Sequence, residues 1–271
     1  MATAFSENLT AEQQAQVLQL FQQFQHPSLQ KDLIALNTLK KVEKGGDVLR
    51  IELQLPFAWN TGVEQVKQQL SDALLKATDS KEIKWVVNYQ IATLKRANNQ
   101  PAVKGVKNII AVTSGKGGVG KSSVSVNLAL ALQAQGARVG ILDADIYGPS
   151  IPHMLGAPHQ RPTSPDNQHI TPIKAYGLSA NSIGFLMDED NATIWRGPMA
   201  SSALSQLLNE TLWDSLDYLV IDMPPGTGDI QLTLSQQIPV TGAVVVTTPQ
   251  DIALLDAVKG VSMFERVSVP V

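Results

Sequence analysis

The stretch SGKGGVGKSS, residues 114–123, decides the fold. From Gly115 to Ser122 it fits a phosphate-binding pattern, in which a glycine and any four residues are followed by glycine, lysine and serine or threonine. The apolar run NIIAVTS, residues 108–114, precedes it and a helical pattern follows, which is the strand–loop–helix context that the pattern requires. The sequence therefore predicts a phosphate-binding loop rather than a glycine-rich turn without a ligand.

The residues of this loop have the chemistry to bind a nucleotide together with a metal ion. Gly117, Gly118 and Gly120 let backbone N–H groups turn toward a phosphate, and the N-terminus of the next helix adds a favourable dipole. Lys121 is expected to pair with the β- and γ-phosphates, and the hydroxyl of Ser122 to hold Mg²⁺. ATP is therefore predicted to contact Gly115, Lys116, Gly117, Gly118, Val119, Gly120, Lys121 and Ser122.

Acidic residues at two strand ends are predicted to complete the site. The run VGILDADIYGPS ends a strand in Asp143 and Asp145, which share one face because successive strand residues alternate. Carboxylates beside a phosphate loop can orient water or bind Mg²⁺. The run YLVIDMPPGTGD ends another strand in Asp222, and we expect Asp143 and Asp222 to be metal-binding residues. The alternative for Asp143 and Asp145 is that they simply cap a strand.

Three loops carry weaker predictions. Gly226 is predicted to place its backbone N–H where a γ-phosphate would sit. The segment TTPQD, residues 247–251, follows a strand at its carboxyl end, where nucleotides usually bind in such sheets. The loop histidines His153, His159 and His169 have the spacing of no helix or strand metal pair, so we expect no metal site there.

Composition and charge exclude several classes of protein. The chain of 271 residues has a net charge of −3. Residues 101–271 hold 10 Lys and Arg against 14 Asp and Glu, so they lack the basic excess of nucleic-acid-binding proteins. No apolar run is long enough to span a bilayer, and the polar N-terminus is no secretory signal. We expect a cytoplasmic protein that binds neither nucleic acid nor membrane.

Strand and helix patterns divide the chain into two predicted domains. Residues 1–94 predict a small α+β domain, whose first helix begins at Thr10 with Gln13 three residues on as a reciprocal cap. Residues 95–107 are interpreted as a linker. Residues 108–271 alternate apolar strands with helices, which is typical of a doubly wound α/β domain with a mostly parallel sheet. The expected fold class is a P-loop NTPase preceded by a small α+β domain.

Several motifs resemble those of known families. The N-terminal domain resembles the small domain called MIP18-like or DUF59. KGGVGKS, residues 116–122, resembles the deviant Walker A loop of the MinD, ParA and iron-protein class of P-loop ATPases. The resemblance implies that Lys116 reaches a nucleotide held by a facing subunit of a homodimer, that Asp145 orients the attacking water, and that Lys121 takes part in catalysis. A solvated surface lysine is the alternative for Lys116.

The motifs together resemble the Mrp/ApbC family of iron–sulfur cluster carrier proteins. The resemblance covers nearly the whole chain and rests on SGKGGVGKSS, LDADIYGPSIP, WRGPM and DMPPGTGDIQLTL. It implies a homodimeric, Mg²⁺-dependent ATPase that assembles 4Fe–4S clusters or transfers them to apoproteins.

The absence of cysteine is a departure from that family's pattern. The family holds its cluster with a CxxC pair, whereas this sequence contains no cysteine. The final residues, FERVSVPV, look like the opening of one more strand, so we expect an ATPase domain that is incomplete at its C-terminus. A divergent relative without the cysteines is the alternative. In either case these residues include no thiolate ligand for a cluster.

A positioning switch of the MinD or ParA kind is the main alternative function. It shares the phosphate loop, but MinD-like action needs an amphipathic membrane helix and ParA-like action needs a basic face for DNA. The sequence shows neither feature, and the extra N-terminal domain fits neither class. An iron-protein-type electron donor is a further alternative, against which DADIYGPS and WRGPM argue.

Overall fold

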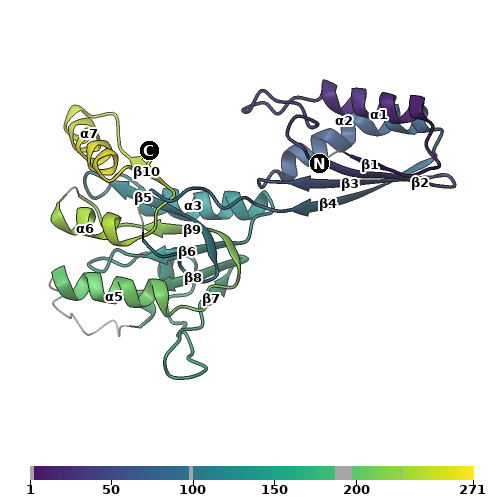
Figure 1. The fold of residues 1–271 in the computed structure, drawn as a ribbon. Coiled ribbons are helices and arrows are strands. Elements are labelled where there is room, and N and C mark those ends of the chain that lie inside the picture. The colour runs from purple at the N-terminus through teal and green to yellow at the C-terminus, as the bar shows by residue number, and fades with distance from the viewer. Residues whose placement is uncertain (1–2, 98–99, 187–196, 227) are drawn as a thin grey trace. The chain divides into compact units, whose positions relative to one another are not determined.

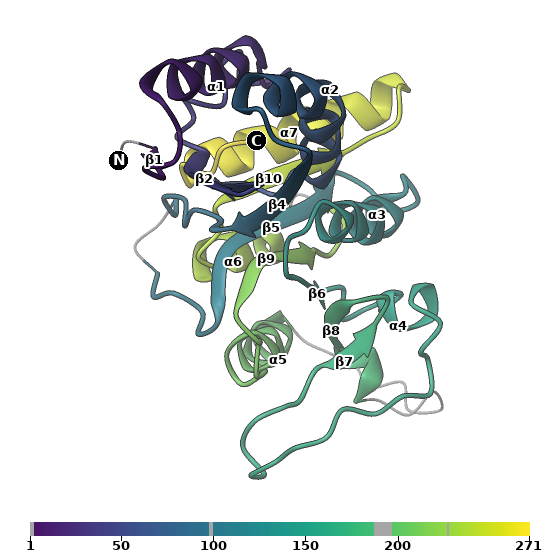
Figure 2. The same cartoon turned by 90° about the vertical axis from the view of Figure 1, so that its right-hand side faces the viewer.

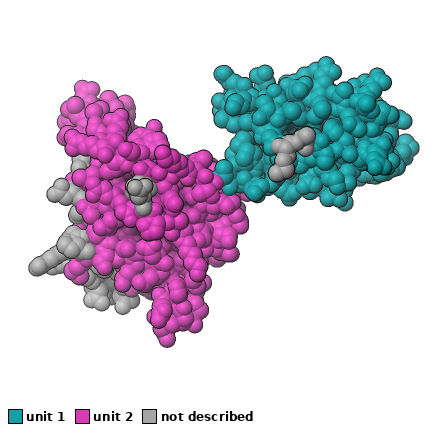
Figure 3. Space-filling model, in the orientation of Figure 1, with its two compact units in different colours: residues 1–92 teal, residues 93–271 magenta. Residues whose placement is uncertain are grey.

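The chain forms two compact units, Met1–Ala92 and Thr93–Val271 (Figure 3). The computed structural model describes residues 3–97, 100–186, 197–226 and 228–271. Each unit has its own hydrophobic core. The division falls near the expected domain end at residue 94, and the likeness of the first unit to a MIP18-like domain stays a prediction.

The first unit is a four-stranded sheet with two helices on one face (Figure 1). Its strands lie in the order β1-β2-β3-β4, with β2 and β3 antiparallel and the other neighbours parallel. The elements are β1 (Ala4–Phe5), α1 (Ala11–Gln23), β2 (Leu39–Gly45), β3 (Val48–Leu55), α2 (Asn60–Thr78) and β4 (Glu82–Tyr89).

Local sequence signals account for these elements. The N–H of Gln13 donates to Thr10 Oγ1 and the N–H of Thr10 donates to Gln13 Oε1, so α1 begins with the expected reciprocal cap. In β3, Leu49 and Ile51 are buried while Arg50 between them is exposed, which is the alternation of a strand with one covered face. This unit therefore folds around the apolar face of its sheet.

The second unit contains a six-stranded sheet in the order β10-β5-β9-β6-β8-β7. All neighbours are parallel except β7 and β8, so the predicted mostly parallel sheet is confirmed. Its elements are β5 (Val106–Ser114), α3 (Lys121–Ala134), β6 (Val139–Asp143), α4 (Ile151–Met154), β7 (Ile173–Ala175), β8 (Leu178–Ser182), the 3-10 helix η1 (Ile183–Phe185), α5 (Gly197–Asn209), β9 (Leu216–Asp222), α6 (Asp229–Gln237), β10 (Gly242–Val246) and α7 (Asp251–Arg266).

Helices cover both faces of this sheet, as a doubly wound fold requires. Leu204 of α5, Leu234 of α6 and Phe264 of α7 share one apolar core with the strands. Helix α3 packs against β5, β6 and β9, and Figure 2 shows it on the other side of the sheet from α5 and α6. Because both faces are covered, all five residues of β6 are buried. No helix of the described residues is long and apolar enough to cross a membrane.

Two irregular segments lie against the second unit. In the segment interpreted as a linker, the N–H of Ala97 donates to the carbonyl of Val240 at 3.0 Å, and Val103 is buried in the core. Ala97 and Val103 therefore pack against the core of this unit. At the other end, the N–H of Ala243 in β10 donates to the carbonyl of Pro270 at 2.8 Å, although the residues after α7 form no strand.

Candidate nucleotide-binding site

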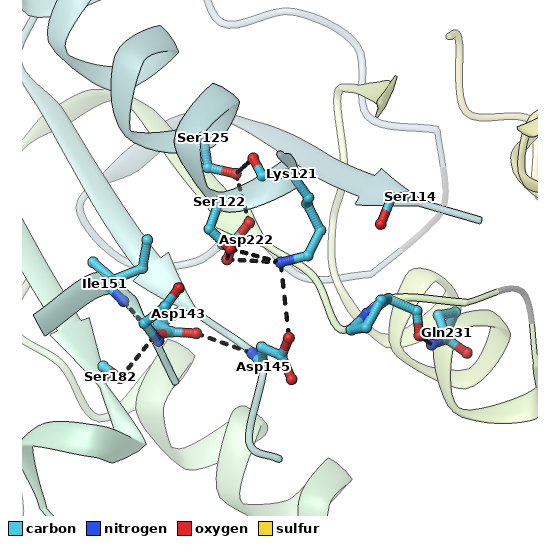
Figure 4. A network of polar contacts seen from close by, with 12 residues as sticks. Ser114, Lys121, Ser122, Ser125, Asp143, Asp145, Ile151, Ser182, Asp222 and Gln231 are labelled. Atoms are coloured by element: carbon cyan, nitrogen blue, oxygen red, sulfur yellow. Dashed lines mark hydrogen bonds and ion pairs between the residues drawn. The ribbon is translucent and has the colours of Figure 1, made fainter. Parts of the chain in front are cut away.

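The predicted site residues gather at the carboxyl edge of three neighbouring strands (Figure 4). β9 lies between β5 and β6. Asp222, the last residue of β9, is opposite Val112 of β5 and Asp143 of β6. The phosphate loop begins where β5 ends, so the loop and the acids from two other strands meet at one edge. This is where ligands bind in open α/β sheets.

The glycines of the loop leave its open side free. Gly118 and Gly120 have φ angles of 78° and 90°, in the left-handed region that favours glycine. A Cβ atom at Gly117, Gly118 or Gly120 would meet no other atom within 4 Å. Gly115 differs, because its Cβ would lie 2.5 Å from the Cβ of Asp256 in α7. Gly115 therefore allows close packing against α7, while the other glycines leave room for a ligand.

Lys121 lies among the acids at the start of α3. Its side chain is 7% exposed, and its Nζ is 2.7 Å from Asp222 Oδ2 and 3.9 Å from Asp145 Oδ2. Nζ also donates to Ser122 Oγ at 3.2 Å. The one cation that the described residues place among Asp143, Asp145 and Asp222 is thus Lys121. Because the site has more carboxylates than cations, a further positive charge would stabilise the ionised carboxylates.

Asp222 has a hydrogen-bond partner on each oxygen. Ser122 Oγ donates to Oδ2 at 2.7 Å, and Ser125 Oγ donates to Oδ1 at 2.6 Å. Asp222 is 0% exposed. The contact between Ser122 and Asp222 fits the expected metal pair, because a hydroxyl and a carboxylate side by side are ligands that Mg²⁺ accepts. The contact of Ser125 was not predicted from the sequence.

Asp143 organises the loop that follows it. Asp145 N and Ser150 N donate to its two oxygens at 3.1 and 3.0 Å, and Ile151 N and Ser182 Oγ add bonds of 3.1 and 3.2 Å. The side chain is fully buried. The predicted role of Asp143 in metal binding stays a prediction. In this structure its contacts position the segment that carries Asp145.

Burial changes the acidity of both aspartates of this loop. Burial raises the pKa of Asp143 to about 7, against the opposing effect of the backbone hydrogen bonds that it accepts. Burial also raises the pKa of Asp145, and the charge of Lys121 opposes that rise. Asp145 is 14% exposed and faces the Lys121 ammonium. Since β6 ends at Asp143, strand alternation does not place Asp145, and the loop geometry does.

The turn after Asp222 does not have the predicted free donor. The N–H of Gly226 donates to the carbonyl of Ser114 at 2.7 Å, and Gly226 has a φ of 110°. Gln231 Nε2 donates to the carbonyl of Pro225 at 2.5 Å and closes the turn. In this conformation the Ser114 carbonyl accepts the bond from the Gly226 N–H, so the contact of Gly226 with a γ-phosphate stays a prediction.

Lys116 differs from Lys121 in its surroundings. Its carbonyl accepts a bond of 2.8 Å from Ser114 Oγ, and its side chain is partly exposed. No carboxylate of the described residues forms an ion pair with its ammonium group. Val119 is also partly exposed. The motif WRGPM from the sequence analysis includes Trp195 and Arg196, which lie outside the described residues.

A metal ion bound at this edge would need phosphate oxygens of the nucleotide as additional ligands. The described residues contain no group of three or more His, Cys, Asp or Glu side chains arranged to hold a metal. Mg²⁺ commonly binds through one or two carboxylates together with substrate phosphates. Ser122 and Asp222 fit that arrangement, because they contact each other beside the open loop. Lys121, which is expected to bind the phosphates, contacts the same carboxylate.

A family profile matches the part of the chain that holds this site. Residues 105–271 match the ParA profile described as NUBPL iron-transfer P-loop NTPase. The chain belongs to this family. The match confirms the predicted P-loop NTPase fold and, by its description, favours iron transfer over the positioning switch.

Relatives agree with the profile. The iron–sulfur cluster carrier protein of Haemophilus influenzae is 90% identical over 271 residues, which are all of this chain and 73% of the relative. The iron–sulfur cluster carrier protein of Escherichia coli K12 is 66% identical over 248 residues, covering 92% of this chain and 67% of the relative. The predicted resemblance to iron–sulfur cluster carriers is confirmed.

A solved structure supports the assignment of the fold. The nucleotide-binding protein of Archaeoglobus fulgidus in complex with ADP is 39% identical, with a TM-score of 0.54. The alignment covers 62% of this chain and 65% of that protein.

Proposed function

We propose that the protein binds and hydrolyses ATP with Mg²⁺ and uses the cycle to carry 4Fe–4S clusters to apoproteins. The observation that carries the proposal is the cluster of Lys121, Ser122 and Asp222 beside an open glycine loop. The family is one of P-loop NTPases described as iron-transfer proteins, and an ADP complex is known for a relative.

Nucleotide binding is proposed to redirect Lys121. Its ammonium group contacts Asp222 Oδ2 at 2.7 Å and can exchange this carboxylate for phosphate oxygens, which are also anionic. The backbone N–H groups of Gly117–Gly120 and the N-terminus of α3 then add donors for the phosphates. Gly118 and Gly120 permit this because they already have left-handed φ angles.

Ser122 and Asp222 would hold the metal ion. The bound metal supplies positive charge that neutralises the phosphates. Asp222 lies at the end of a central strand and is fully buried, so the sheet fixes the position of its backbone. Asp143 supports the site from the next strand by positioning the following loop.

Asp145 is proposed to orient the water that attacks the γ-phosphate. It is the most exposed of the three acids in the site, at 14%, and its carboxylate lies on the Lys121 side. An ionised carboxylate can accept a hydrogen bond from water and hold it in place. Lys121 opposes the effect of burial on the pKa of Asp145 and so favours that ionised form.

Lys116 is proposed to act on the nucleotide of a second copy in a homodimer. Its partly exposed side chain has no ion-pair partner among the described residues, in contrast to Lys121. A cation supplied in trans stabilises charge that develops during phosphoryl transfer. Two copies must then meet for hydrolysis, so specific activity is expected to rise with protein concentration.

The cluster is cargo rather than part of this site. The 271 residues contain no cysteine, so thiolate ligands cannot come from them. We therefore expect this chain to bind nucleotide but to show no cluster absorbance after treatment with iron and sulfide. The proposed recipients are apoproteins, and the relatives are named as carriers of iron–sulfur clusters.

The proposal is tested by ATP hydrolysis and nucleotide binding across a range of protein and Mg²⁺ concentrations. We expect Mg²⁺-dependent release of phosphate with a specific activity that increases with protein concentration. Binding without hydrolysis at any protein concentration would contradict the ATPase assignment. A stable brown cluster formed on this cysteine-free chain would contradict the assignment of the ligands.

A further inference from the structure

We propose that Ser125 is a positioning residue that fixes the carboxylate of Asp222 for metal binding. This inference rests on the proposed function and extends it. Ser125 lies on α3 one turn after Lys121, and residues four apart share one face of a helix. The phosphate-loop pattern ends at Ser122, so the motif assigns Ser125 no role.

The contact between Ser125 and Asp222 is short and shielded from water (Figure 4). Ser125 Oγ lies 2.6 Å from Asp222 Oδ1, and both residues are 0% exposed. A hydroxyl in a helix usually bonds to the carbonyl one turn back. Here that carbonyl, of Lys121, is farther away, at 3.1 Å. The carboxylate is therefore the closer acceptor, at a distance typical of a charge-assisted hydrogen bond.

The two oxygens of Asp222 have partners of different kinds. Oδ2 contacts Lys121 Nζ and Ser122 Oγ, each at 2.7 Å. Both of these groups are proposed to bind the ligand, Lys121 through phosphate and Ser122 through the metal. Oδ1 contacts Ser125, which is buried and has no proposed ligand contact. The bond from Ser125 can therefore persist while the bonds to Oδ2 are redirected.

Loss of this hydroxyl is expected to weaken metal binding rather than nucleotide binding. The last torsion of an aspartate side chain is broad, so Oδ1 needs a donor to hold the carboxylate plane. Groups that orient a metal ligand typically change metal affinity or activity about 10- to 100-fold when removed. The metal-free nucleotide is expected to bind normally, because its contacts come from Lys121 and the loop backbone.

The experiment compares Ser125→Ala with a matched control, Ser235→Ala. Ser235 is also 0% exposed, and its Oγ donates to the carbonyl of Gln231 one turn back on α6, at 2.7 Å. The control therefore removes a buried helical hydroxyl without removing a bond to a carboxylate. Ser125→Thr keeps the hydroxyl and serves as the conservative variant. The measurements are Mn²⁺ affinity in the presence of ADP by electron paramagnetic resonance, and labelled-ADP affinity without metal.

We expect Ser125→Ala to bind Mn²⁺ about 10- to 100-fold more weakly than the wild type. Ser235→Ala and Ser125→Thr are expected to stay close to the wild type, and all variants are expected to bind metal-free ADP equally. Equal Mn²⁺ affinity for Ser125→Ala and Ser235→Ala would overturn the positioning role. If the wild type itself bound no metal with ADP, the proposed function would fail together with this inference.

Discussion

Strand β9 carries a buried acid near each end, and the two have opposite kinds of surroundings. Near its start, Asp217 accepts hydrogen bonds from Lys107 Nζ at 2.8 Å and from Arg138 Nε and Nη2 at 3.1 and 3.0 Å. At its end, Asp222 contacts one cation, Lys121, which also lies near Asp145. One end therefore has two cations for one acid, and the other has one cation for several acids.

The difference separates a structural ion pair from the proposed nucleotide-binding site. At the start of β9, Asp217 accepts hydrogen bonds from both cations, so these contacts link β5, β9 and the segment before β6. At the end of β9, Lys121 is the one cation that the described residues place beside Asp145 and Asp222, and a metal ion and Lys116 of a facing copy are proposed to add positive charge there. Acidic residues with perturbed pKa values cluster at functional sites, although structural ion-pair networks also perturb pKa values.

The largest expected effect concerns Lys116, which is proposed to reach the nucleotide at the carboxyl edge of a facing copy. We expect Lys116→Ala to lower kcat for ATP hydrolysis about 10³-fold, the lower range for a cation supplied in trans. ATP affinity is expected to stay close to the wild type, because the loop and Lys121 remain. Steady-state turnover and labelled-ATP binding measure the two quantities.

The exposed Lys104→Ala is the matched control for that variant, since it removes the same charge from the same unit. Its turnover is expected to equal that of the wild type. Normal turnover in Lys116→Ala would contradict the proposed contact with a partner's nucleotide.

The second largest effect is expected for Lys121, the cation that already contacts Asp222. Truncating one partner of a buried, hydrogen-bonded charge pair costs about 2 to 5 kcal/mol, so Lys121→Ala should weaken ATP binding at least about 30-fold. The loss should appear in binding itself rather than in turnover alone. Equilibrium titration with a labelled ATP analogue measures it, and retained affinity would refute the assignment of the phosphate loop.

At the start of β9, removing the charge of Asp217 should lower the stability of the fold and leave ATP binding unchanged. Burial alone would raise the pKa of Asp217, but hydrogen bonds from Arg138 and Lys107 lower it to about 2. The stabilisation is therefore complete above the ordinary value of 3.8 and is lost as the pH falls toward 2.

We expect Asp217→Asn to lower the free energy of unfolding by about 2 to 3 kcal/mol at neutral pH, as for hydrogen bonds to a charged group. Urea denaturation measures this change. ATP affinity of the folded variant should match that of the wild type. A loss of ATP binding without a loss of stability would remove the contrast between the two ends of β9.

The smallest effect concerns Asp143, whose pKa is raised to about 7 by burial. The unfolded chain releases this proton near 3.8 and the folded protein near 7, so stability falls as the pH rises between these values and is constant above them. The wild type should lose about 2 kcal/mol more than Asp143→Asn between about pH 5 and pH 7. Parallel pH dependences of urea denaturation in the two proteins would show that Asp143 does not titrate there.

Regular elements and the loop motif could be predicted from the sequence. The apolar run of residues 108–114 lies within β5, and the cap of Thr10 and Gln13 is present. Both depend on neighbours along the chain. The phosphate loop and its strand–loop–helix context were also predictable, because glycine, lysine and serine occur there at fixed spacing.

The hydrogen bonds of the loops that follow the strands could not be predicted from neighbouring residues in the sequence. Alternation gave the faces of β6 but not the course of the chain after Asp143, whose oxygens accept bonds from Ser150 and from Ser182 on another strand. The N–H of Gly226 is used by Ser114, which lies far away in the sequence. Such bonds depend on how the loops fold back on the sheet.

Ser125 is a partial exception. Its spacing from Lys121 places it on the face of α3 that meets the strand ends, so the sequence carried a signal. The signal was weak, because a serine in a helix usually bonds to its own backbone.

A crystal structure with Mg²⁺ and a non-hydrolysable ATP analogue tests the central claim most directly. We expect that Lys121 Nζ has moved from Asp222 to the phosphates, and that Lys116 of a facing copy contacts the same nucleotide. A nucleotide bound with Lys121 still on Asp222, in a single copy whose Lys116 points into solvent, would contradict it.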